Sequence, residues 1–176
     1  MKINLHLTDE ELGNSDDFEL CETAWQKVSD AYWNSPDGKK EHEVDYPESI
    51  FASNLPEHWW AAYAIHAFEY DFHSGSIQQF LDNHDGLLDS KMMEAFKLVE
   101  AVEYVPFYEK AAAIYRKKKE QISELEGDAE YESIDCEYWT ALIPINKGID
   151  ELMKRKDSRG FLADYIRRNR SKYQES

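Results

Sequence analysis

The sequence predicts an all-α fold, a compact multi-helix single domain of about seven to nine helices. Three observations favour it: apolar residues recur at helical spacing, turn residues separate these segments, and no run alternates with the period of two typical of strands. Apolar residues make up 42% of the 176 residues and aromatic residues 14%. This is too rich in core-forming side chains for a disordered acidic chain. We therefore assign residues 1–176 to one acidic helical domain.

The first helix is predicted from an apolar stripe whose members are three or four residues apart. The stripe consists of Phe18, Cys21, Trp25, Val28 and Tyr32. Asn14 or Ser15 is the expected N-cap, and the turn residues 35–38 end the helix. A polar loop over 39–47 and a short helix over 48–53 follow.

A longer helix is predicted from Pro56 to about His73. Its apolar residues cover much of its circumference, which is typical of a helix buried on all sides, so we expect it to be the central helix. Gly75 ends it, because glycine allows the positive φ that often terminates a helix. Ser76 is the expected cap of a short helix over 77–83.

Four further helical segments complete the predicted fold. They begin at Asp89 or Ser90, at Pro106, near residue 137 and near residue 159. The inward side chains of the first are Met92, Phe96, Val99 and Val102. Residues 127–137, rich in acidic residues, are expected to be irregular. Pro144 is expected to begin or kink the helix over 137–156.

The charge is distributed unevenly along the chain. The formal net charge is −16, beyond the magnitude of about 2–8 that suffices for solubility in a small domain. Residues 1–150 hold 32 acids and 12 bases, whereas residues 151–176 hold 4 acids and 8 bases. We expect the basic tail to pack against the acidic body or to be solvated. A nucleic-acid contact by the tail is the alternative, which the acidic body opposes by repelling phosphate.

Two cysteines and no long apolar segment define the expected environment. Cys21 and Cys136 are too few for a disulfide framework, so we expect two buried thiols in a reducing cytoplasm. Residues 1–12 lack the apolar run of a signal peptide, and no stretch approaches the roughly 20 apolar residues that span a bilayer. We expect a cytoplasmic protein without membrane contact.

One helix face carries weak candidates for a metal site. His66, Glu69 and His73 are three and four residues apart, and their side chains are of types that bind zinc or iron. A separation of seven residues between two histidines is a long reach for one ion, and the Glu-x-x-His pairs of di-iron bundles are absent. No phosphate loop or nucleophile motif occurs. We predict no metal, no cofactor and no catalytic residue.

The acidic clusters are the stronger functional signal. The candidate partner-binding carboxylates are Asp9, Glu10, Glu11, Asp16, Asp17, Glu41, Glu43, Asp45, Glu124, Glu126, Asp128, Glu130 and Glu132. Carboxylates three or four residues apart on a helix are about 5–6 Å apart at Cβ, comparable with neighbouring phosphates on a nucleic-acid strand. Such a surface can bind the Lys and Arg side chains that contact DNA phosphates.

A motif after the long helix adds a resemblance. Gly75, Gln79, Phe80 and Asn83 match a Gly-Gly-aromatic-x-Gln-aromatic-aromatic-x-Asn run, with Ser76 in place of the second Gly and Ile77 in place of an aromatic. This run resembles that of a bacterial domain-of-unknown-function family that includes the nineteen-kilodalton DNA-mimic protein. The family-like core covers about 56–170. Gln79 and Asn83 are one turn apart, and we expect a structural role for them, tying a neighbouring loop.

The resemblance implies an all-helical, acidic and dimeric protein, with at least one family member that binds a DNA-binding protein. We therefore expect a protein-binding domain whose partner is basic, and a DNA mimic as the leading function. The alternatives are an immunity-type or other interaction protein without DNA mimicry and, third, a helical metal-binding protein or enzyme. No direct nucleic-acid contact is expected.

Overall fold

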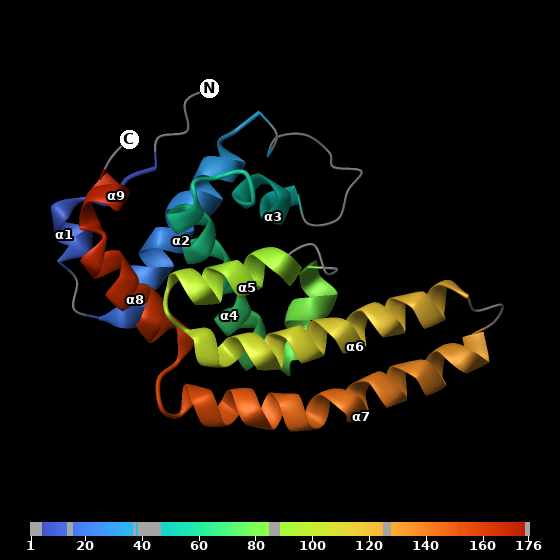
Figure 1. The fold of residues 1–176 in the computed structure, drawn as a ribbon. Helices are drawn as coiled ribbons and strands as arrows, with labels where there is room; N and C mark the ends of the chain where they lie inside the picture. The colour runs from blue at the N-terminus through green and yellow to red at the C-terminus, as the bar shows by residue number, and fades with distance from the viewer. Residues whose placement is uncertain are drawn as a thin grey trace.

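The computed structural model describes residues 5–13, 16–36, 38, 47–84, 89–124 and 128–174. These residues form nine α-helices and one 3-10 turn, and they contain no strand, which confirms the all-α class (Figure 1). No helix within these ranges is long and apolar enough to cross a membrane.

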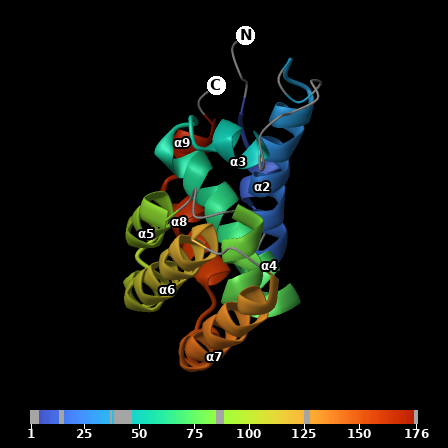
Figure 2. The same cartoon turned by 90° about the vertical axis from the view of Figure 1, so that its right-hand side faces the viewer.

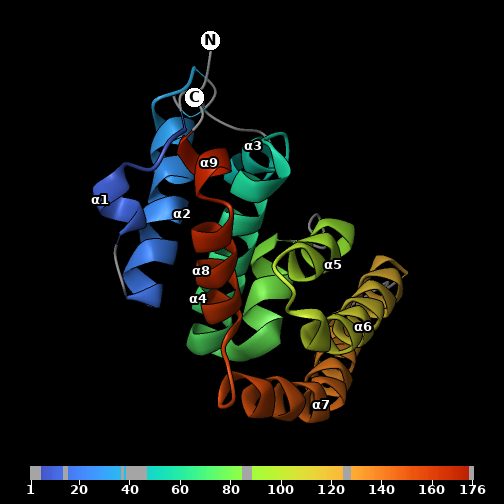
Figure 3. The ribbon, with the colours of Figure 1, turned by 60° about the vertical axis from the view of Figure 1, so that its left-hand side comes forward.

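Helix α4 (Glu57–His84) runs through the centre of the molecule, as the sequence predicted. Buried residues lie on all its sides, among them Trp59, Ala62, Ile65 and Phe68. It is covered by α2 (Asp17–Trp33), α5 (Asp89–Leu98) and α8 (Ser158–Arg168), among others (Figures 2 and 3). Phe68 packs edge-on against Phe80, Phe96 and Tyr104 at ring-centroid distances of 5.2–6.2 Å.

The backbone of α4 breaks at two residues. Gly75 is extended, with φ −164° and ψ 24°, whereas Ser76 has φ 67° and ψ −171°. The positive φ expected at Gly75 therefore lies one residue later, in a region of backbone space that is essentially restricted to glycine. Ser76 occupies the position at which the family motif has its second Gly. A serine here costs about 1–3 kcal/mol of conformational strain.

A side chain from α7 (Asp128–Met153), not Ser76, caps the helix after the break. The Ile77 backbone N–H donates to Asn146 Oδ1 at 3.1 Å, and Asn146 Nδ2 donates to Gln78 Oε1 at 3.2 Å. The Ser76 hydroxyl donates to the same Gln78 oxygen at 2.5 Å. The break is thus fixed from a neighbouring helix, because an orphan backbone N–H at a buried helix start needs a partner.

The motif residues connect the two halves of α4. Gln79 Nε2 donates to Asn83 Oδ1 at 2.9 Å, and Asn83 Nδ2 donates to Asp71 Oδ1 at 3.0 Å across the break. Phe80 is fully buried. The chain of hydrogen bonds therefore ends in the first half of the same helix and not in a neighbouring loop.

Two long antiparallel helices, α6 (Val105–Ser123) and α7, form an arm in which the C-terminal end of α6 and the N-terminal end of α7 project from the body (Figure 1). Lys118 is buried between them: its ammonium group is 2.8 Å from Asp135 and 4.1 Å from the Tyr138 ring centroid.

The prediction that residues 127–137 are irregular was wrong, since α7 begins at Asp128. The stripe Tyr138, Leu142, Ile145, Ile149 and Leu152 is buried against the rest of the fold. Pro144 lies inside α7, on its exposed side. Cys136, which was expected to be buried, is also exposed on α7, whereas Cys21 is buried as expected.

Several local predictions were also wrong. Asp16 is the N-cap of α2, accepting from the Glu19 N–H at 3.1 Å, while Asn14 and Ser15 lie outside the described residues. Phe18 is about half exposed, because the buried face of α2 includes Leu20, Cys21, Ala24 and Val28. Val102 is exposed, because the positive φ of Glu100 ends α5 before a 3-10 turn over Val102–Tyr104.

The two ends of the described chain meet. The remaining helices are short. Helix α1 (Asp9–Leu12) precedes α2, helix α3 (Pro47–Ala52) precedes α4, and α9 (Arg170–Gln174) is the last helix of the described residues. The Leu7 N–H donates to the Tyr173 carbonyl at 2.7 Å, and the Tyr173 hydroxyl donates to the His58 carbonyl at 2.9 Å. Helices α1, α2, α8 and α9 therefore gather on one side of α4 (Figure 3).

The strain at Ser76 generates a stability prediction. Ser76→Gly relieves the strained conformation and loses one hydrogen bond, so we expect the free energy of unfolding to rise by about 1 kcal/mol in urea denaturation. Ser74→Gly, two residues earlier in ordinary helix, is the control and should lower it by about 0.5 kcal/mol. Equal destabilisation by both changes would contradict the strain.

Candidate functional site

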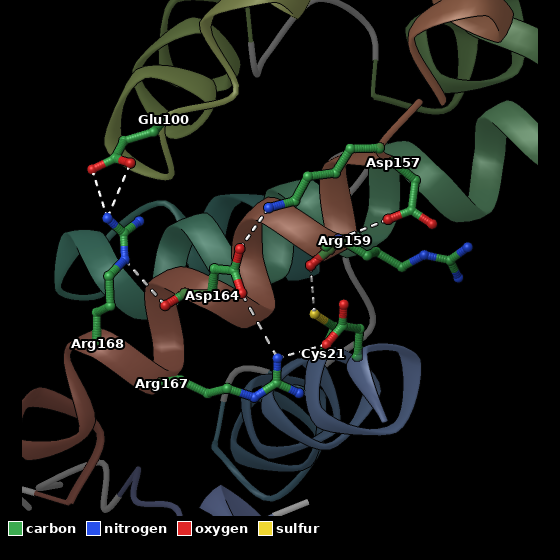
Figure 4. A network of polar contacts seen from close by, with 10 residues as sticks. Cys21, Glu100, Asp157, Arg159, Asp164, Arg167 and Arg168 are labelled. Atoms are coloured by element: carbon green, nitrogen blue, oxygen red, sulfur yellow. Dashed lines mark hydrogen bonds and ion pairs between the residues drawn. The ribbon is translucent and has the colours of Figure 1, made fainter. Parts of the chain in front are cut away.

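The bases of α8 and α9 are engaged with acids of the body. Arg167 Nη1 is 2.6 Å from Asp17 Oδ1, and Arg168 Nη1 is 2.9 and 3.0 Å from the two oxygens of Glu100 (Figure 4). Arg170 reaches Asp9 at 3.5 Å. The tail thus packs against the acidic body, and these three arginines form ion pairs with acids of the same chain.

The same pairs neutralise much of the N-terminal acidic group. Asp9 and Asp17 are paired with arginines, and Glu11 lies 2.8 Å from Lys27 and also completes the capping box of α1 with Thr8. Asp16 caps α2. The side chains of Asp9, Glu11, Asp16 and Asp17 are therefore engaged within the chain, which leaves Glu10 as the exposed acid of this set without an ion-pair partner in the described part of the chain.

The candidate acids Glu124, Asp128, Glu130 and Glu132 lie where α6 ends and α7 begins, at the opposite end of the molecule from α1 (Figure 1). Glu124 follows α6 and Glu132 lies in the second turn of α7, and both are exposed. Asp128 and Glu130 are placed in the first turn of α7 by its backbone. The remaining candidates, Glu41, Glu43, Asp45 and Glu126, lie outside the described residues. The described candidates therefore form two separate patches.

One face of α2 adds acids that the candidate set omitted. Glu19, Glu22 and Asp30 border a surface depression of about 400 Å³ between α1 and α2, whose other lining residues are Glu11, Thr23, Gln26 and Lys27. The signal was present in the sequence, because positions 19, 22, 26 and 30 share one helix face. This face continues the N-terminal patch along α2.

A larger depression, the aromatic groove, lies beside this acidic face. Its volume is about 760 Å³, and it is lined by Phe18, Glu22, Trp25, Tyr32, Trp33, Glu48, Tyr63, His66, Ala67, Tyr70, Asp71, Asn83, His84 and Arg159, from α2, α3, α4 and α8. Trp33 and Tyr70 are 58% and 67% exposed. Phe18 and Trp25 were expected in a buried stripe of α2, but they lie on the side of α2 that lines the groove.

The polar groups of the groove are unevenly satisfied. The His66 ring stacks on Trp25 at 4.8 Å, and burial, with the charge of Arg159, lowers the pKa of His66 to about 4. His66 Nδ1, Glu48 Oε1 and Arg159 Nε are buried without a hydrogen-bond partner. Asp71, by contrast, is held by Asn83 and lies 3.2 Å from His84 Nε2.

The weak metal candidates do not converge on one point. Glu69 Oε1 accepts hydrogen bonds from the Ser158 backbone N–H at 2.6 Å and from its hydroxyl at 2.5 Å, so Glu69 caps the start of α8. His73 Nε2 is 3.3 Å from Glu69 Oε2, whereas His66 lines the groove. Across the described ranges no group of three or more His, Cys, Asp or Glu side chains is arranged to hold a metal.

Comparison with known families identifies one match. The model of the DMP19-like protein family matches residues 53–169, close to the core expected from the motif. No curated protein and no solved structure matches the chain.

The buried imidazole generates a prediction about pH. Between about pH 6.5 and 4 the unfolded chain protonates His66 and the folded chain does not, so stability falls as the pH drops through this window, by up to about 3 kcal/mol. His66→Phe, which can keep the ring stacked on Trp25, should remove this part of the pH dependence of urea denaturation. The control is His6→Gln, at an exposed site. An unchanged pH dependence in His66→Phe would contradict the assignment.

Proposed function

The chain belongs to the DMP19-like protein family, and on that basis we propose that it is a DNA mimic that occupies the nucleic-acid-binding surface of a basic DNA-binding protein. The observation that carries the proposal is the occupation of the C-terminal cations by intramolecular pairs. Because each of these bases is paired with an acid of the same chain, the excess of acids that gives the net charge of −16 remains for a partner to meet. Charge complementarity then speeds association with a basic protein.

The arm is the part of the acidic surface best suited to enter a DNA-binding cleft. Glu120, on α6, and Glu124, the residue directly after it, are four residues apart, and Asp128 and Glu132 are four apart on α7. Neighbouring carboxylates at this spacing are about 5–6 Å apart at Cβ. The C-terminal end of α6 and the N-terminal end of α7 project from the body (Figure 1), so that a partner can reach them without contacting the other helices.

Neutralising the arm should weaken partner capture. The immobilised chain is expected to retain basic DNA-binding proteins from a lysate of its source cells, to release them to duplex DNA, and to bind more weakly as salt rises. Glu124→Gln/Glu132→Gln should reduce this capture several-fold. Glu94→Gln/Glu109→Gln removes the same charge from exposed sites on α5 and α6 and should leave capture largely unchanged.

Three results would count against the proposal: capture insensitive to salt, capture that duplex DNA does not reverse, and equal loss in the two double variants. A captured partner with no nucleic-acid function would favour an immunity-type interaction protein.

We also propose that the protein is a homodimer, as the family resemblance implies. Cys136, Trp139 and Ile143 lie on one exposed face of α7, with Ile143 63% exposed. Exposed apolar side chains on one face are typical of an interface, and a two-fold axis would bring this face against its own copy.

A charge on this face should break the dimer. We expect Ile143→Glu to be monomeric by size-exclusion chromatography with light scattering, because the carboxylate would be buried without a partner. Ile50→Glu places the same change on α3, across the molecule from α7 (Figure 1), and should stay dimeric. A monomeric unmodified chain would refute the dimer directly.

A further inference from the structure

We propose that the aromatic groove is a binding site for an arginine side chain of the partner protein. This inference rests on the proposed function, because it names the side chain by which a basic partner is recognised. It adds a shaped site to what would otherwise be a diffuse acidic surface.

The size and walls of the groove suit a long, flat cation. Its volume of about 760 Å³ lies in the range of about 300–1,000 Å³ typical of ligand sites, enough for an arginine and part of the residue beside it. Trp33, Tyr70 and Phe18 are its exposed rings. A guanidinium group is attracted to the face of an aromatic ring. The groove shows this contact within the chain, since Arg159 lies 4.9 Å from the centroid of Phe18.

The charges at the groove favour a cation over an anion. Three acids line it: Glu22, Glu48 and Asp71. Arg159, the arginine among the described residues of the wall, has an acidic neighbour, with its Nη2 3.8 Å from Glu69 Oε2. An anionic ligand would therefore meet three carboxylates and a cation that already has a counter-charge. A cationic ligand meets the carboxylates and the ring faces.

Two buried acceptors supply the second, independent observation. His66 is only 6% exposed and lines the groove, and its Nδ1 has no hydrogen-bond partner. Glu48 Oε1, in the wall contributed by α3, is also without one. Buried acceptors without partners are costly, and a guanidinium group offers five N–H donors. A small movement of either side chain toward an inserted arginine would satisfy it.

The groove also adjoins the acidic face of α2. Glu22 borders both the aromatic groove and the acidic depression between α1 and α2. Acids along α2 can attract a basic surface from a distance, and the groove can then select one side chain from it. Helix α2 thus contributes both acids that attract a basic surface and residues that line the groove.

The test uses the full chain and three peptides that differ in one side chain: Gly-Leu-Arg-Leu-Gly, the same peptide with citrulline, and the same peptide with lysine. Citrulline keeps the shape of arginine without its charge. NMR titration, following the indole N–H signals of Trp25 and Trp33, should show saturable shifts with the arginine peptide. We expect binding weaker by about tenfold for citrulline and about threefold for lysine.

Matched variants locate the site. Trp33→Leu and Glu22→Gln should each weaken binding of the arginine peptide about three- to fivefold, whereas Glu94→Gln, which removes an exposed charge from α5, should not. Thermal unfolding of each variant checks that the fold is kept. Equal binding of the citrulline or lysine peptide, or unchanged binding in both groove variants, would overturn the proposal.

These outcomes are separate from those of the proposed function. Capture of a DNA-binding protein that depends on Glu124 and Glu132 can hold while the peptides fail to bind, in which case only the groove assignment is lost. Peptide binding without any such capture would keep the arginine site and remove the mimicry.

Discussion

The fold depends on a helix with little surface suited to water. Between Glu57 and Ser74, α4 carries aromatic and aliphatic residues around much of its circumference, so most of its surface needs covering helices. This requirement fixes α2, α5 and α8 around one axis. It also explains the bend at Gly75 and Ser76, because the second half of α4 turns to meet α6 and α7 and is capped there by Asn146.

The surface follows from what this core leaves outside. Acids near the N-terminus and bases near the C-terminus come together because α1, α2, α8 and α9 cover the same side of α4, where Arg167 pairs with Asp17 and Arg170 with Asp9. Exposed ion pairs of this kind contribute little stability, about 0–1 kcal/mol each. Their larger effect here is that these arginines are paired with acids of the same chain.

Periodicity predicted the fold well where apolar spacing was strong, as in α4, α5 and α6. It failed at the start of α7, because the acids Glu130, Glu132 and Asp135 suggested an irregular segment. Acids favour the positive end of a helix, and Lys118 of α6 pairs with Asp135 there. The strain at Ser76 could not be read from composition, because it depends on how two helix segments dock. The acids were visible as clusters, but their pairing across 150 or more residues was not.

The meeting of the chain ends has a consequence for the order of assembly. Helix α8 covers one face of α2, and the contacts between them include the hydrogen bond from Cys21 Sγ to the Arg159 carbonyl at 3.3 Å. At a synthesis rate of about 5–20 residues per second, α8 is synthesised on the order of ten seconds after α2. In that interval α4 through α7 can associate, but the side of α4 reserved for α8 stays open to water. The side of α4 that α8 covers is thus buried only after residues 158–168 have been made, and the nascent chain exposes it until then.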